Sequence, residues 1–242
     1  MAVGSPYTHY KLNDSDTNTT VADDGSGAKD GVASGNTDTL SVAGRIDDCF
    51  DFVAASTEEV TLTALAEAIR ADATGSLSLW FNFDIAAGTI FAINDASATQ
   101  TWFRVSIDTG AGNRIAVSLS DQGGYEWLAY TPGAGIVAST WYHLVIVQGG
   151  SIPVIYINTV PVDITWANQT DRSKWLTDVN GADLLDTGHI ACQEQSGAET
   201  DYYDGKIDQV KYYQNEALSA ADVVVLYKEG LNDNAVFFGA NF

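Results

Sequence analysis

The sequence predicts an all-β protein folded as a two-sheet antiparallel sandwich with one or two short helices. Short stretches in which apolar and polar residues alternate recur along most of the 242 residues, and turn-forming residues separate them. The alternation is clearest at residues 76–83 (SLSLWFNF) and 141–148 (WYHLVIVQ). The length suits one large all-β domain, and no low-complexity linker or internal repeat divides the chain.

The strands and the first helix follow from local patterns. Residues 141–148 and 152–158 predict a hairpin around Gly149–Gly150. Residues 61–72 place apolar side chains at helical spacing, so a short helix is expected there. Residues 13–39 have turn composition. Further strands are expected at residues 6–13, 45–54, 89–93, 102–108, 114–120, 123–130, 189–192 and 207–212.

The segment 205–230 (GKIDQVKYYQNEALSAADVVVLYKEG) changes from a two-residue period to a helical one. Ser219 is a good N-cap, and Asp222 follows three residues later as a capping-box partner. The segment resembles the end of LamG-like, concanavalin A-type domains, which often reads G-x-I-D-x-V-x-Y and then A-L-S. The resemblance implies a jelly-roll form of the sandwich.

Other motifs extend the resemblance over most of the chain. Residues 141–145 (WYHLV) and 155–158 (IYIN) are similar to a strand pair of this family, although Thr159 stands where a glycine is common. Residues 24–31 (DGSGAKDG) resemble an early loop of the family. The resemblance therefore implies a LamG-like domain over residues 1–230 and a tail over residues 231–242 that packs on the domain or on a partner.

The charge balance limits the class of partner. Lys and Arg number 11 and Asp and Glu number 32, so the net charge is 11 − 32 = −21. Such a charge argues against nucleic acid and anionic membranes as partners, because both are repelled. No stretch has the roughly 20 apolar residues of a membrane span, and the first residues lack the features of a signal peptide. A location on a virion exterior or outside the cell is expected.

A structural Ca²⁺ is implied by the resemblance. Asp208 is expected to point inward from a strand, where a carboxylate needs a charged or hydrogen-bonding partner. In this family the matching Asp commonly binds calcium, and Asn13, Asp14 and Asp24 would lie near it. The alternative is that Asp208 accepts only backbone hydrogen bonds, or pairs with Arg45 or Lys11.

Aromatic residues suggest two binding surfaces, for a glycan or for a protein partner. One surface consists of Tyr125, Trp127 and Tyr130. The other contains Trp166, Arg172 and Trp175. Trp80 and Trp141 lie in the clearest strands and are expected in the core. In the tail, Val236, Phe237 and Phe238 either pack on the sandwich or dock on a neighbouring subunit.

Catalytic patterns are missing from the sequence. No E-x-D-x-E strand supplies paired carboxylates for a glycosidase, and no G-x-S-x-G occurs. His9, His143 and His189 have no evident Ser or Cys partner, and His143 is expected to be a buried hydrogen-bonding residue. Cys49 and Cys192 are expected to be free buried thiols or one disulfide, and their spacing does not indicate zinc.

The sequence thus favours a recognition or assembly module that is not an enzyme. The leading hypothesis is a virion-associated protein, such as a phage decoration, fibre or tail protein, that binds a partner subunit, a second copy of itself or a surface polysaccharide. The alternatives are a secreted carbohydrate-binding lectin module and a cryptic glycan-cleaving enzyme.

Overall fold

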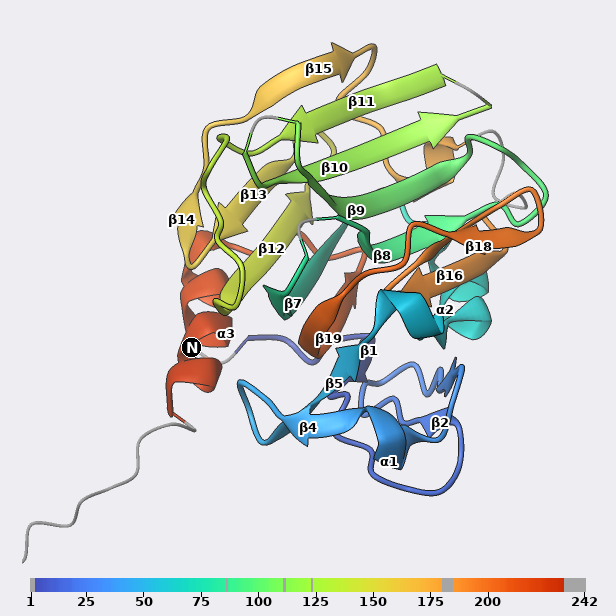
Figure 1. Cartoon of the computed structure of the whole chain (residues 1–242). Coiled ribbons are helices and arrows are strands. Elements are labelled where there is room, and N and C mark those ends of the chain that lie inside the picture. Colours follow the sequence, from blue (N-terminus) through green and yellow to red (C-terminus); the bar gives the residue numbers. More distant parts are fainter. Residues whose placement is uncertain (1–2, 86, 111, 123, 180–184, 233–242) are drawn as a thin grey trace, which may run out of the picture.

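The computed structural model shows two antiparallel sheets packed face to face (Figure 1). It describes residues 3–85, 87–110, 112–122, 124–179 and 185–232. Both the all-β class and the jelly-roll sandwich are confirmed. Within the described residues, no helix is both long enough and apolar enough to cross a membrane.

The first sheet has eight strands and holds the chain's closing strand near its middle. Strand β1 pairs with β19 beside this main order. In spatial order the sheet contains β14 (Val160–Pro161), β13 (Val154–Ile157), β12 (Tyr142–Gln148), β7 (Gly75–Phe83), β19 (Gly205–Gln214), β5 (Asp48–Phe52) and β4 (Ser41–Ala43), with β1 at Thr8–Tyr10.

The second sheet has nine strands, and a small hairpin lies beside it. Its order is β15 (Thr165–Gln169), β11 (Gly124–Tyr130), β10 (Arg114–Asp121), β9 (Trp102–Asp108), β8 (Thr89–Asn94), β16 (Thr187–Ile190), β6 (Val60–Thr61), β3 (Gly31–Ala33) and β2 (Thr20–Val21). The hairpin pairs β17 (Gln193–Gln195) with β18 (Ala198–Thr200).

Three α-helices and two 3₁₀ turns complete the described structure, against an expectation of one or two helices. They are α1 (Thr37–Leu40), α2 (Thr63–Ile69), α3 (Ala220–Asn232) and the 3₁₀ turns Ala54–Ser56 and Leu176–Asp178. Helix α1 lies in the polar stretch for which only turns were predicted. Helix α2 buries Leu65 and Ile69 as its spacing predicts. Its N-cap residue is Leu62, which makes no side-chain capping hydrogen bond.

The closing segment folds as its pattern predicts. The side chain of Asp222 accepts from Ser219 N at 2.9 Å, and Asp222 N donates to Ser219 Oγ at 3.3 Å, so the capping box starts α3. The helix packs on the outer side of the eight-stranded sheet, where Tyr227 stacks on Trp80 with ring centroids 5.3 Å apart. Because α3 continues to Asn232, the predicted domain boundary at residue 230 falls inside a helix.

The main core lies between the two sheets. Strand β9 shows why: Phe103, Val105 and Ile107 are buried in this core, while the alternate residues face the other way. Trp80 is buried as predicted, but under α3 rather than between the sheets. Trp141 precedes β12 and is only partly buried, so its assignment to the core is wrong.

Candidate functional site

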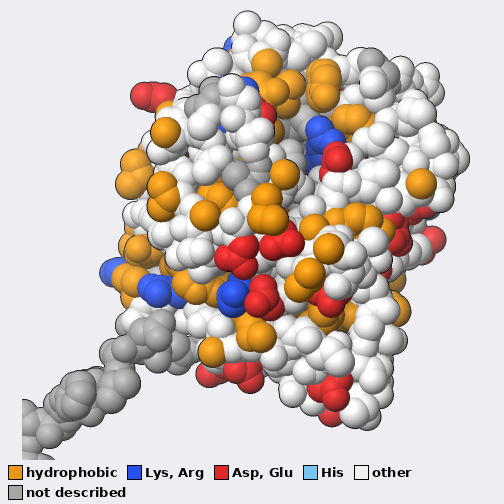
Figure 2. Space-filling model, viewed as in Figure 1, with side chains coloured by type: hydrophobic (Ala, Val, Ile, Leu, Met, Phe, Trp, Pro, Cys, Tyr) orange, Lys and Arg blue, Asp and Glu red, His pale blue; other side chains and the backbone are white. Residues whose placement is uncertain are grey.

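A hollow of about 310 Å³ lies over the outer face of the nine-stranded sheet. Figure 2 views this face and shows a depression with a basic and an acidic side chain side by side. Hydroxyl, charged and aromatic side chains line it together with small residues. The lining comprises Ala87, Gly88, Thr89, Arg104, Ser106, Ile107, Asp108, Thr109, Ala116, Tyr125, Leu128, Tyr130 and Asp201.

Strand alternation and register create this hollow. Because Phe103 and Val105 of β9 face the core, Arg104 and Ser106 face outward. Ser106 is directly opposite Ala116 of β10, and Ala116 is opposite Tyr130 of β11. Two small side chains thus form a low floor, and the tyrosine ring rises beside them.

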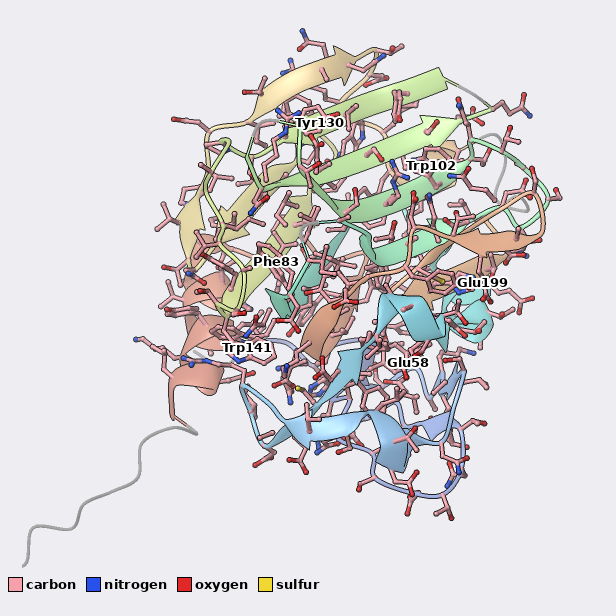
Figure 3. The ribbon with its side chains drawn as sticks, viewed as in Figure 1. Glu58, Phe83, Trp102, Tyr130, Trp141 and Glu199 are labelled. Carbon is pink, nitrogen blue, oxygen red and sulfur yellow. The ribbon has the colours of Figure 1, made fainter. Side chains whose placement is uncertain are left out.

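Arg104 is held in place from two directions. Its Nη1 donates to Gln193 Oε1 at 2.8 Å and lies 3.5 Å from Asp201 Oδ2. Its guanidinium carbon lies 4.8 Å from the centre of the Trp102 ring, which is labelled in Figure 3. Gln193 begins the β17–β18 hairpin and Asp201 directly follows it, so the hairpin fixes a cation at the edge of the hollow.

A second fixed cation lies near Tyr130. Arg114 pairs with Asp108 at 2.6 Å, and its guanidinium carbon is 3.6 Å from the centre of the Tyr130 ring. Hydrogen bonds from Gly110 N and Arg114 lower the pKa of Asp108 despite its partial burial, so the carboxylate is ionised at neutral pH. The Arg114 guanidinium therefore covers one face of the Tyr130 ring, and Tyr130 lines the hollow.

The residues predicted for the first aromatic surface divide into two groups. Tyr125 and Tyr130 line the hollow, as a binding role requires. Trp127 is fully buried, and its Nε1 donates to the carbonyl oxygen of Lys174 at 3.1 Å. The prediction that Trp127 contacts a ligand is therefore wrong, because its ring faces the core from β11.

The second predicted surface is also only partly exposed. Trp175 is fully buried, lies parallel to Trp127 at 6.3 Å and donates to the Tyr212 hydroxyl at 3.3 Å. Its predicted binding role is wrong for the same reason. Trp166 of β15 remains partly exposed, with the Arg172 guanidinium 5.1 Å from its ring centre, but neither lines the hollow. The tail residues Val236, Phe237 and Phe238 lie outside the described residues.

The predicted calcium ligands have other partners. Asp208 is fully buried, and its Oδ2 accepts from the backbone N–H groups of Arg45 and Ile46, both at 2.8 Å. Burial raises the pKa of Asp208 to about 7, against the opposing effect of these two donors. The backbone alternative for Asp208 is thus observed, with Oδ1 buried and without a hydrogen bond. Gly44 leaves room for this carboxylate, because a Cβ atom at position 44 would lie only 2.9 Å from Asp208 Oδ2.

Asp14 and Asp24 do not join Asp208. Asp24 pairs with Lys11 at 2.6 Å, and Asp14 accepts from Ala22 N at 3.3 Å. In the described part of the chain, Asp208, Asp14 and Asp24 do not form a group of carboxylates within 4.8 Å of one another. Two N–H donors at Oδ2 also oppose a cation there, so these residues fit calcium poorly and the calcium site stays a prediction.

One histidine has a serine partner that the sequence did not reveal. His143 Nε2 and Ser78 Oγ are 2.9 Å apart. Both side chains are buried, and burial lowers the pKa of His143 to about 3. The imidazole of His143 is therefore neutral, but it is buried out of reach of a substrate. His143 is thus the buried hydrogen-bonding residue that the sequence predicts.

Sequence reasoning missed Arg104, Asp108 and Asp201. The signal for the first two was available, since alternation across residues 102–108 already placed both on the polar side of a strand. Asp201 gave no such signal, because its approach to Arg104 depends on how the β17–β18 hairpin folds back over the sheet.

Comparisons with known proteins agree with this architecture. Residues 55–224 match the model of the concanavalin A-like lectin/glucanases superfamily. No curated protein matches the sequence. Among solved structures, domain 4 of AbnA, a GH43 extracellular arabinanase from Geobacillus stearothermophilus in complex with arabinotriose, has a TM-score of 0.60 at 15% identity. The match covers 92% of this chain and 98% of that domain.

Two further solved structures share the fold. The CBM40 of Ruminococcus gnavus IT-sialidase, bound to α2,3-sialyllactose, has a TM-score of 0.54 at 14% identity, covering 66% of this chain and 85% of that one. The leech intramolecular trans-sialidase, complexed with 2,7-anhydro-Neu5Ac, has a TM-score of 0.55 at 16% identity. That match covers 66% of this chain and 24% of the enzyme. The sequence match spans most of the chain and the fold agrees with it, so the protein belongs to the concanavalin A-like lectin/glucanase superfamily.

Proposed function

We propose that this protein is a carbohydrate-binding module without catalytic activity, and that it holds a glycan in the hollow over β8–β11. The observation that carries the proposal is the hollow itself, where Tyr125 and Tyr130 lie beside the fixed Arg104–Asp201 pair. Solved structures of similar fold that contain arabinotriose and sialyllactose support it.

The chemistry of the hollow suits a sugar. A tyrosine ring offers an apolar face for the C–H side of a pyranose or furanose, and its hydroxyl remains available for hydrogen bonding. The Arg104 guanidinium donates to ring or hydroxyl oxygens, and the Asp201 carboxylate accepts from sugar hydroxyls. A volume of about 310 Å³ accommodates one or two sugar rings, with the rest of a longer glycan in solvent.

The partner in this proposal is a surface polysaccharide, and the location is extracellular. The virion-assembly hypothesis made the tail residues 236–238 the docking element, and these lie outside the described residues. In the part of the chain that the structure describes, no feature favours a virion subunit over a glycan as the partner of the hollow.

A glycan array followed by calorimetry tests the proposal. Arg104→Ala and Tyr130→Ala should each weaken binding of the best glycan by about 10- to 100-fold, the loss expected for a charged hydrogen bond or a stacked ring. Arg172→Ala is a matched control, since it removes another arginine that lies over a tryptophan, but outside the hollow. Tyr156→Ala on the opposite sheet is the control for Tyr130.

The outcomes separate the hypotheses. Binding that falls with Arg172→Ala and not with Arg104→Ala would move the site to the Trp166 surface. Cleavage of the bound glycan, abolished by Asp201→Asn, would replace the proposal with the glycan-cleaving alternative. Failure of the folded protein to bind any glycan on a broad array would contradict carbohydrate binding.

A further inference from the structure

Three side chains with metal-binding atoms meet under the β17–β18 hairpin. A carboxylate oxygen of Glu59, a ring nitrogen of His189 and the Sγ of Cys192 all lie within 4.8 Å of one another. Their residues are 4%, 1% and 0% exposed. Within the described residues, this is the one group of His, Cys, Asp or Glu side chains with such spacing.

Strand pairing brings the first two members together. His189 of β16 is directly opposite Thr61 of β6, and Glu59 lies two residues before Thr61, so it projects to the same face. The Thr61 hydroxyl donates to the Glu59 carboxylate at 3.2 Å. The carboxylate is thereby oriented toward the imidazole, with Glu59 Oε2 3.3 Å from His189 Nδ1.

A break in the strand adds the cysteine. Strict alternation would place residues three apart on opposite faces, so Cys192 would point away from His189. Between them Ala191 has φ +72°, in the left-handed region, where a residue with a Cβ costs about 1–2 kcal/mol. This turn brings the thiol to the side of the histidine.

The electrostatic surroundings favour a cation. His189 Nε2 lies 3.5 Å from Glu194 Oε2, so carboxylates approach both of its nitrogens. A bound cation would stabilise the buried carboxylate of Glu59 beyond its contacts with Thr61 and His189.

We propose that Glu59, His189 and Cys192 bind a single Zn²⁺. Zinc bonds of about 2.0–2.3 Å to N, O and S place tetrahedral ligand atoms roughly 3.3–3.8 Å apart. The Glu59–His189 separation of 3.3 Å already has this value, and the others lie within 4.8 Å. His189 Nδ1 binds the metal, and water completes the tetrahedron. Nε2 then donates to the Thr187 hydroxyl at 3.2 Å, with Glu194 Oε2 3.5 Å away.

The donor set selects the kind of metal. Calcium takes oxygen ligands, whereas a thiolate and an imidazole suit zinc and related transition metals. The spacing of Cys49 and Cys192 does not indicate zinc, and Glu59 lies far along the chain from the His-x-x-Cys pair of residues 189 and 192. Cys192 directly precedes Gln193, so the metal would also anchor the hairpin that positions Arg104.

The test uses Co²⁺ as a spectroscopic probe on the purified full chain after treatment with a chelator. The wild type should bind one equivalent and show a thiolate-to-cobalt charge-transfer band, which one equivalent of Zn²⁺ removes. Cys192→Ser should lose the band. Cys49→Ser is a matched control, since Cys49 is also a free buried thiol but belongs to no such cluster, and it should keep the band.

A second variant leaves all three ligands intact. Glu194→Gln removes the carboxylate partner of His189 Nε2 and should weaken Zn²⁺ affinity by about 10- to 100-fold. Absence of a charge-transfer band in folded wild type, or a band that depends equally on Cys49, would overturn the proposal. The cluster would then be a metal-free set of contacts among Glu59, His189 and Glu194, and adding Zn²⁺ would leave the melting temperature of the protein unchanged. Because the readout is the metal alone, it is independent of glycan binding.

Discussion

Replacing Asp208 by asparagine should change how stability depends on pH. The side chain is fully buried, Oδ2 accepts two backbone N–H groups, and Oδ1 makes no hydrogen bond. Asparagine keeps the shape and an oxygen acceptor for Arg45 and Ile46 without a charge that must be desolvated. The variant Asp208→Asn should therefore resemble a permanently protonated Asp208.

The magnitude follows from the pKa. In the folded protein the pKa of Asp208 is about 7, against an ordinary value of 3.8. A pKa raised on folding means that the folded state holds the proton more tightly, so this group's contribution is complete below about pH 4 and is lost as pH rises toward 7. At about 1.36 kcal/mol per pH unit, the loss approaches about 4 kcal/mol as an upper bound.

Urea unfolding followed by tryptophan fluorescence measures this difference. Between pH 4 and pH 7.5, Asp208→Asn should gain stability over wild type by up to about 4 kcal/mol, and the two should be similar near pH 4. Parallel curves across this range would refute the reasoning. Repeating the series with Ca²⁺ and with EDTA tests the calcium prediction, since a metal on the carboxylate would stabilise wild type and not the variant.

Two further changes test the packing and the early loop. Trp175→Ala should destabilise the fold by about 3–5 kcal/mol in urea unfolding, because it empties a fully buried site between Phe103 and Tyr212. Trp166→Ala in the edge strand β15 should cost distinctly less. Equal losses of stability would contradict the assignment of Trp175 to the core. Asp23→Ala should lower the free energy of unfolding by about 1–3 kcal/mol and speed amide hydrogen exchange across residues 23–29. The reason is that the Asp23 carboxylate accepts the backbone N–H groups of His9, Gly25 and Lys29. Unchanged exchange would contradict this role.

The fold could be predicted largely from local patterns. Strand β19 and helix α3 carry their own signals, because alternation, the Ser219 cap and helical spacing are all written in consecutive residues. The β12–β13 hairpin was equally accessible and is observed with Leu144 opposite Ile157. The helix and the hairpin form from contacts that are close in the sequence. Strand β19 pairs with the distant strands β7, β5 and β1, but its alternation alone marks it as a strand.

The binding side chains were harder to predict. Trp175 lies in a polar segment and Trp127 lies between two tyrosines, and only the two-sheet packing shows that both rings are buried, with their N–H groups satisfied inside. Likewise, Asp201 approaches Arg104 only because a segment about 100 residues later in the chain returns to the same sheet. Cys192 approaches His189 because Ala191 between them has a left-handed conformation. Residue identity and spacing carry no record of these contacts.

The most direct test of the central claim is a crystal structure with the glycan that ranks highest on an array. Binding in the hollow predicts a sugar ring stacked on Tyr125 or Tyr130, at a centroid distance of about 4.5–7 Å, with hydrogen bonds to Arg104 or Asp201. A sugar located on the Trp166–Arg172 surface, or away from the nine-stranded sheet, would contradict it.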